Sequence, residues 1–199
     1  MTHRYQAQLT GLRRLLALDP EYIKSFAATP AGFWQAFWLL PLSMAARLVG
    51  DLLLAFSPPS PDDTPLALSS FLKQLALENL ATIILWALYP LLVVYLSRSF
   101  GVGKNYFRYM VPYLWFTALL PVTVLPCDLL AWAGLLPGGQ ALAIEIFVYI
   151  IGAGYMWFLA WKGLLVGGWT AAGLVLLNIA VTGVVSSAAL KLNTIALPF

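Results

Sequence analysis

The chain has 199 residues, of which 61% are apolar and 10% charged, with a net charge of +3. Its mean hydropathy is +0.85. Soluble domains carry about 25% charged residues, because a surface that faces water needs them. The composition therefore excludes an ordinary soluble protein and predicts an all-α polytopic membrane protein. The mild net charge gives no indication of nucleic-acid binding.

Residues 1–30 form an N-terminal segment with two short helix-prone pieces. In the first, leucines recur at helical spacing and two arginines face elsewhere (Leu9, Leu12, Leu15, Leu16; Arg13, Arg14). In the second, Asp19 is a predicted N-cap, Pro20 suits the first helical position and Glu21 the first turn, so a helix restarts there. The segment is either a basic amphipathic helix in the cytoplasmic interface or a cytoplasmic helix packed under the bundle. Charged residues interrupt its apolar positions, which argues against a signal peptide.

Residues 31–199 contain five apolar stretches, each close to the 20 or so residues that cross a bilayer. They run over about 32–56, 71–96, 110–133, 141–161 and 169–190. Backbone groups in lipid must be hydrogen-bonded within the protein, so each stretch is predicted to be a helix. Four prolines inside these stretches predict kinks, because proline removes a helix donor (Pro41, Pro90, Pro121 and Pro126). We therefore expect one five-helix transmembrane domain.

The loops between these stretches differ in charge. Residues 57–70 are acidic and proline-rich, and residues 134–140 are uncharged. Basic residues gather before the first stretch, in the second loop with Arg98, Lys104 and Arg108, and in the fourth turn. The positive-inside rule then predicts a cytoplasmic N-terminus and a C-terminus outside. The compact loops favour a bacterial inner membrane.

Five ionisable residues fall within the predicted spans, near the ends that this orientation places outside: Arg47, Asp51, Glu78, Asp128 and Glu145. Charges at membrane depth are costly, so they are the first candidates for function. Four spans contribute, which predicts one shared polar cluster. Arg47 and Asp51 are four residues apart, on one helix face, and a direct pair is expected. The cluster is interpreted either as an outward-facing cation or proton site or as hydrated acids with a structural Arg47–Asp51 pair.

Aromatic and small residues have simpler interpretations. Most aromatic residues lie near predicted membrane boundaries, as in aromatic belts (Phe33, Trp34, Trp38, Tyr106, Tyr109, Trp132, Trp157, Trp161 and Trp169). Small residues in the last two spans permit close helix contact, inside the chain or with a partner (Gly152, Gly154, Gly173, Gly183, Ser186 and Ser187).

Nothing in the sequence indicates an enzyme or a cofactor. The single cysteine, Cys127, and the single histidine, His3, exclude zinc sites of the usual kind. No Walker, nucleophile-elbow, HExxH or dinucleotide motif is present. Residues 101–104, Gly-Val-Gly-Lys, are only a fragment of a phosphate loop and predict a flexible basic turn.

Several of these features occur together in one known pattern. An Asp-Pro segment from Asp19 to Phe26 precedes the first span, and a Gly-x-Gly-basic loop leads into the aromatic residues 106–109. Pro121 lies in the middle of the third span, and a glycine turn, 163–168, joins the last two. Over about residues 15–190 the chain resembles the Yip-type family of five-span membrane proteins, especially its bacterial members.

That resemblance implies a five-helix bundle with a cytoplasmic N-terminus, and it supplies no catalytic residues. Eukaryotic members bind small GTPases and usually have a long N-terminal cytoplasmic region. This chain lacks such a region, which argues against GTPase binding here. We expect a non-enzymatic accessory or membrane-organising subunit that associates with the bilayer and with other membrane proteins, or with itself. The alternative is a small transporter or channel that binds cations or protons at the acids.

Overall fold

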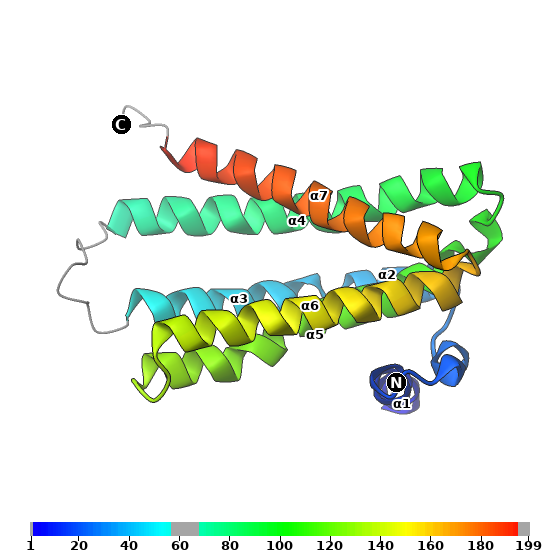
Figure 1. Ribbon diagram of the computed structural model, residues 1–199, viewed down its shortest axis with the longest axis horizontal. Coiled ribbons are helices and arrows are strands. Elements are labelled where there is room, and N and C mark those ends of the chain that lie inside the picture. Colours follow the sequence, from blue (N-terminus) through cyan, green and yellow to red (C-terminus); the bar gives the residue numbers. More distant parts are fainter. Residues whose placement is uncertain (1, 57–67, 195–199) are drawn as a thin grey trace.

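A computed structural model describes residues 2–56 and 68–194, which form helices and no strand (Figure 1). The α-helices are α1 (Thr2–Leu16), α2 (Pro30–Phe37), α3 (Leu40–Ala55), α4 (Leu68–Ser99), α5 (Tyr106–Trp132), α6 (Gly138–Leu164) and α7 (Gly168–Thr194). Two short 3-10 helices are η1 (Pro20–Ser25) and η2 (Gly103–Asn105). Most of the predicted acidic loop, residues 57–67, lies outside the described residues.

The predicted number of spans is confirmed. Five segments of the described chain are long and apolar enough to cross a membrane: Pro30–Leu53, Leu68–Ser99, Gly103–Trp132, Gly139–Leu164 and Gly168–Thr194. The first span is interrupted between α2 and α3, where one continuous helix was expected. Pro41 explains the break, because its ring clashes with the carbonyl four residues earlier, at Phe37, where α2 ends. Pro90, Pro121 and Pro126 lie inside the unbroken helices α4 and α5.

The spans form two groups that meet at one end. α4 packs along α7, while α5 packs between α3 and α6. In Figure 1 these groups lie above and below one another, converge near η2 and separate toward the opposite end. We call the converging end, which carries Arg98, Lys104, Arg108 and Lys162, the basic end. The opposite end, toward which the four span acids lie, is the acidic end.

The buried core lies nearer the basic end. The first half of α5 is almost fully buried, with Tyr109, Met110 and Val111 at 0% exposure. Leu159 of α6 and Val93 of α4 pack into the same cluster. One close approach joins α5 to α6: a Cβ atom placed on Gly163 would lie 2.9 Å from the backbone Cα of Tyr109. The spans therefore pack together at the basic end, and the two groups separate toward the acidic end (Figure 1).

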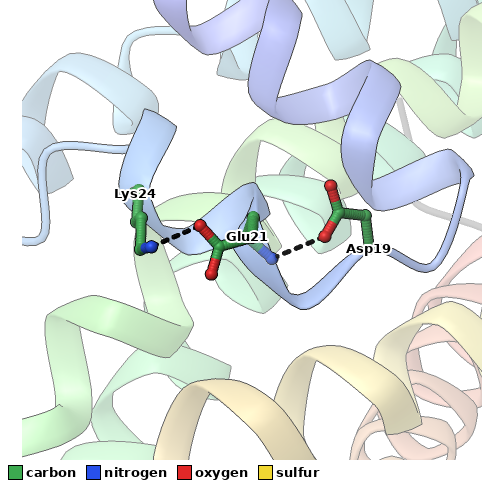
Figure 2. Close-up of polar contacts among 3 residues, drawn as sticks. All are labelled: Asp19, Glu21 and Lys24. Carbon is green, nitrogen blue, oxygen red and sulfur yellow. Dashed lines mark hydrogen bonds and ion pairs between the residues drawn. The ribbon is translucent and has the colours of Figure 1, made fainter.

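The N-terminal cap predicted from Asp19, Pro20 and Glu21 is present. The Asp19 carboxylate accepts a hydrogen bond of 2.9 Å from the Glu21 backbone N–H, and Glu21 forms an ion pair with Lys24 (Figure 2). The helix that starts there is a single 3-10 turn that ends at Ser25, shorter than a restarted α-helix. Its role is to turn the chain so that Tyr22 faces the core.

α1 packs against the protein and also keeps an exposed apolar face. Leu12 and Leu15 are buried, whereas Leu9 and Leu16 are more than half exposed. The Tyr155 hydroxyl of α6 donates a 2.8 Å hydrogen bond to the Leu16 carbonyl. In Figure 1 α1 is seen end-on while the spans lie lengthwise, so α1 runs across the spans beside the bundle. α1 is therefore packed against the bundle with some of its leucines exposed, and its place relative to the membrane interface stays a prediction.

Candidate functional site: an intramembrane cavity and its charged mouth

One cavity is lined by residues from all five spans. It has a volume of about 500 Å³. Most of its wall is apolar, with Leu85, Trp86, Leu114 and Ile150 among the lining side chains. Its polar lining comes from Ser43, Arg47, Thr82, Tyr89, Tyr113, Thr117, Tyr149, Asn178 and Thr182. Ligand sites usually combine such an apolar wall with a few polar groups.

Tyr89 and Tyr113 line this cavity, and the fully buried Tyr109 lies beside both of them. The Tyr89 and Tyr109 hydroxyl oxygens are 2.7 Å apart, and the Tyr89 hydroxyl donates to the Leu174 carbonyl at 3.3 Å. Tyr109 is therefore the donor within that pair. Asn178 donates through Nδ2 to the Tyr113 hydroxyl at 2.7 Å. No acceptor among the described residues takes the Tyr113 proton, so this hydroxyl can donate to a bound molecule.

A second cavity adjoins the first between α4 and α7. Its volume is about 250 Å³. The two cavities share Arg47, Thr82, Leu85 and Thr182 in their walls. The smaller one is richer in polar groups at the acidic end and adds Gln74, Glu78, Ser186 and Asn193. Arg47 therefore lies where the two cavities adjoin.

The structure brings the five predicted charged residues together. Arg47 and Asp51 come from α3, Glu78 from α4, Asp128 from α5 and Glu145 from α6. Asp51 interacts electrostatically with Arg47, Glu78 and Asp128, and Glu145 interacts with Arg47 and Asp128. We call these residues the charged cluster. Of this cluster, Arg47 and Glu78 line the two cavities described here.

Close packing of α3 on α5 holds part of the cluster in place. A Cβ atom on Gly50 would lie 2.9 Å from the Asp128 carboxylate oxygen Oδ2, so that side chain lies directly against the α3 backbone. Glu78 accepts a 2.9 Å hydrogen bond from the Gln74 amide. Within the described chain, Arg47 makes no ion pair within 4.0 Å of an acid, so the expected direct pair with Asp51 is not formed.

The described residues hold no group of three His, Cys, Asp or Glu side chains placed to bind a metal ion.

The three basic loop residues do not form one site. Arg98 and Lys104 are exposed to solvent at the basic end. Arg108 turns inward, and its Nε atom is buried without a hydrogen-bond partner. The fully buried Tyr22 hydroxyl also lacks a partner. Burial raises the pKa of Tyr22 well above its ordinary range, and the Arg108 guanidinium partly opposes that rise.

Most of the predicted small-residue contacts are absent inside this chain. Gly154, Gly173 and Gly183 have open space where a Cβ atom would lie, and Ser186 and Ser187 are exposed. A Cβ atom placed on Gly152 would lie 3.4 Å from Leu120 Cδ1, an ordinary van der Waals contact. Gly50 and Gly163 instead lie at close contacts between spans, α3 with α5 and α6 with α5. Helical periodicity could have shown which glycines share a face, but which face meets a neighbour depends on the tertiary arrangement.

Comparison with protein-family models, with curated proteins and with solved structures gave no match to this chain. The resemblance to the Yip-type family therefore stays a prediction. Fold and composition define the class: an all-α integral membrane protein with five spans.

Proposed function

We propose that this chain is a non-enzymatic membrane protein that binds a lipid within its bundle and acts as an accessory or membrane-organising subunit. The observation that carries the proposal is the cavity of about 500 Å³ that all five spans line. Its volume lies within the range of roughly 300–1,000 Å³ found for ligand sites. Lipids surround such a bundle, and an acyl chain matches its apolar wall.

The depth of the polar groups also favours a lipid. Arg47 lies eight residues before the end of α3 at Ala55, which is about 12 Å along the helix axis. A headgroup region is about 5–8 Å thick on each side of the hydrocarbon core. We place the end of α3 at the water-facing edge of the headgroup region. Arg47 would then lie just inside the hydrocarbon boundary, where the polar part of a lipid meets its chains.

Native mass analysis of the purified protein in mild detergent tests the proposal. We expect the wild-type chain to carry one lipid that survives mild collisional activation. Ala153 lines the cavity, so Ala153→Phe should fill the space and lower the retained lipid at least fivefold. Gly154, the next residue, has no neighbour within 4 Å, so Gly154→Phe is the matched control and should retain the lipid.

Thermal unfolding of both variants shows whether each has folded. Equal lipid retention by folded Ala153→Phe and Gly154→Phe would refute an intramembrane lipid site. The same spectra detect a different polypeptide bound in a fixed ratio, which would identify the partner of an accessory subunit.

A small transporter or channel is the second candidate. The observation that favours it is that the two cavities adjoin at Arg47. Together they extend from Glu78, near the acidic end, to Tyr89 and Tyr113. Proton or cation flux into liposomes should then fall in Asp51→Asn, Glu78→Gln, Asp128→Asn or Glu145→Gln. Unchanged flux in all four would remove this candidate.

The proposed location is a bacterial inner membrane with the basic end in the cytoplasm. Cys127 is the single cysteine, so Cys127→Ala provides a cysteine-free background. A cysteine at the exposed position Leu135 should react with an impermeant maleimide added outside intact cells, whereas one at exposed Lys104 should not. The reverse pattern would invert the orientation.

A further inference from the structure

The smaller cavity has the composition of a headgroup site. It places Arg47 and Glu78, which carry opposite charges, in one wall of a space of about 250 Å³. Neutral hydrogen-bonding side chains make up the rest of its polar lining: Gln74, Thr82, Thr182, Ser186 and Asn193. The larger cavity, which begins at Arg47, has mostly apolar walls. The smaller cavity thus has the larger share of polar lining, in the same order as the head and the chain of a phospholipid, although both cavities have apolar walls.

Both charged groups are available to a ligand. Arg47 is exposed within these cavities and forms no ion pair within 4.0 Å among the described residues. Its guanidinium presents a planar set of N–H donors that suits the oxygens of a phosphate. The Glu78 carboxylate accepts one hydrogen bond from Gln74 at Oε1. Its remaining lone pairs can accept hydrogen bonds from an ammonium group.

The surrounding charge selects among headgroups. Asp51 interacts electrostatically with Arg47 and with Glu78, and Asp128 interacts with Asp51. The four acids of the charged cluster therefore outnumber the two cations near this cavity, Arg47 and Lys73, whose Nζ donates a 2.8 Å hydrogen bond to the Asn193 carbonyl. A headgroup with a net negative charge is repelled by these acids. A headgroup that carries a phosphate and an ammonium places one charge beside Arg47 and the other beside Glu78. A primary ammonium has three N–H donors for carboxylates, whereas a trimethylammonium has none.

From this geometry we infer that the smaller cavity binds the phosphoethanolamine head of a phospholipid, with its phosphate on Arg47, its ammonium on Glu78 and an acyl chain in the larger cavity. This inference rests on the proposed lipid-binding function and specifies which lipid class the site takes. Lipids with glycerol or choline headgroups and the same chains lack one of the two matched contacts.

Lipid titration of the delipidated, purified protein, followed by native mass spectrometry, tests the inference. The probes are dioleoyl phosphatidylethanolamine, phosphatidylcholine and phosphatidylglycerol. We expect the ethanolamine lipid to bind about tenfold more tightly than either of the others, as expected for one charge-assisted hydrogen-bonded contact. Arg47→Gln should weaken ethanolamine-lipid binding by about tenfold for the same reason.

Glu78→Gln and Glu145→Gln form the decisive pair. Each removes one negative charge from the charged cluster, but only Glu78 lines the headgroup cavity. Glu78→Gln should abolish the preference for ethanolamine over choline, and Glu145→Gln should retain it. An equal effect of both variants would overturn direct recognition by Glu78.

The two levels of the proposal fail separately. Equal affinity of the wild-type chain for all three lipids, with binding still lost in Ala153→Phe, would overturn the headgroup assignment alone. Full binding in folded Ala153→Phe would overturn the lipid site itself.

Discussion

Gly163 joins α6 to α5 through a close contact with backbone atoms in the buried core. It lies in the last turn of α6, where an added Cβ atom would be 2.9 Å from Tyr109 Cα and 3.1 Å from Tyr109 Cβ. A backbone atom cannot rotate away, so Gly163→Ala must push α6 off α5. Overpacking of this kind costs about 1–3 kcal/mol. The helix gains roughly 0.5–1 kcal/mol when alanine replaces glycine, which leaves a net loss of about 0–2.5 kcal/mol, centred at roughly 1 kcal/mol.

Gly154→Ala is the matched control on the same helix. Its Cβ atom meets nothing within 4 Å, so only the helix-propensity gain remains and the variant should be as stable as wild type or more so. Reversible unfolding in mixed micelles, followed by circular dichroism, measures both free energies. Displacement of Tyr109 would also disturb its 2.7 Å hydrogen bond to Tyr89, so Gly163→Ala should weaken lipid retention. Equal stabilities of the two alanine variants would refute the assigned contact.

Three further predictions concern separate parts of the chain. Burial raises the pKa of Tyr22 in the folded chain. As pH rises above the ordinary value of 10.0, the unfolded chain therefore loses the Tyr22 proton before the folded chain does, and the free energy of unfolding falls. Unfolding measured at rising pH should show a shallower fall in Tyr22→Phe, and an identical fall would exclude Tyr22 as a cause. Leu165 ends α6 with φ +58°, which disfavours a side chain. Leu165→Gly should therefore be more stable than Leu165→Ala by about 1 kcal/mol in the same micelle assay, and equal stabilities would contradict backbone strain. Gly50→Ala should lower the free energy of unfolding by less than about 1 kcal/mol, because the facing Asp128 carboxylate can rotate away. A loss as large as that of Gly163→Ala would show that the Asp128 side chain is fixed in place.

Features that depend on local physics were predictable from the sequence. Backbone groups in lipid must be paired within a helix, so long apolar runs define the five spans whatever their packing. The Asp19 cap is equally local, since it joins a carboxylate to a backbone N–H two residues away. The break before Pro41 follows from the geometry of proline, although the sequence indicated a kink where the structure has two helices.

Features that depend on which helix faces meet required the tertiary structure. Gly163 and Gly154 are both glycines of α6, yet only Gly163 contacts α5, because α5 packs against one face of α6 near the basic end. The cluster of charged residues could be expected from the alternating direction of the spans, but its relation to a cavity could not. The two helix groups meet at the basic end and diverge beyond it (Figure 1), and residues of all five spans line the cavity. The divergence of the two groups depends on side-chain packing between residues far apart in the chain, which no local pattern encodes.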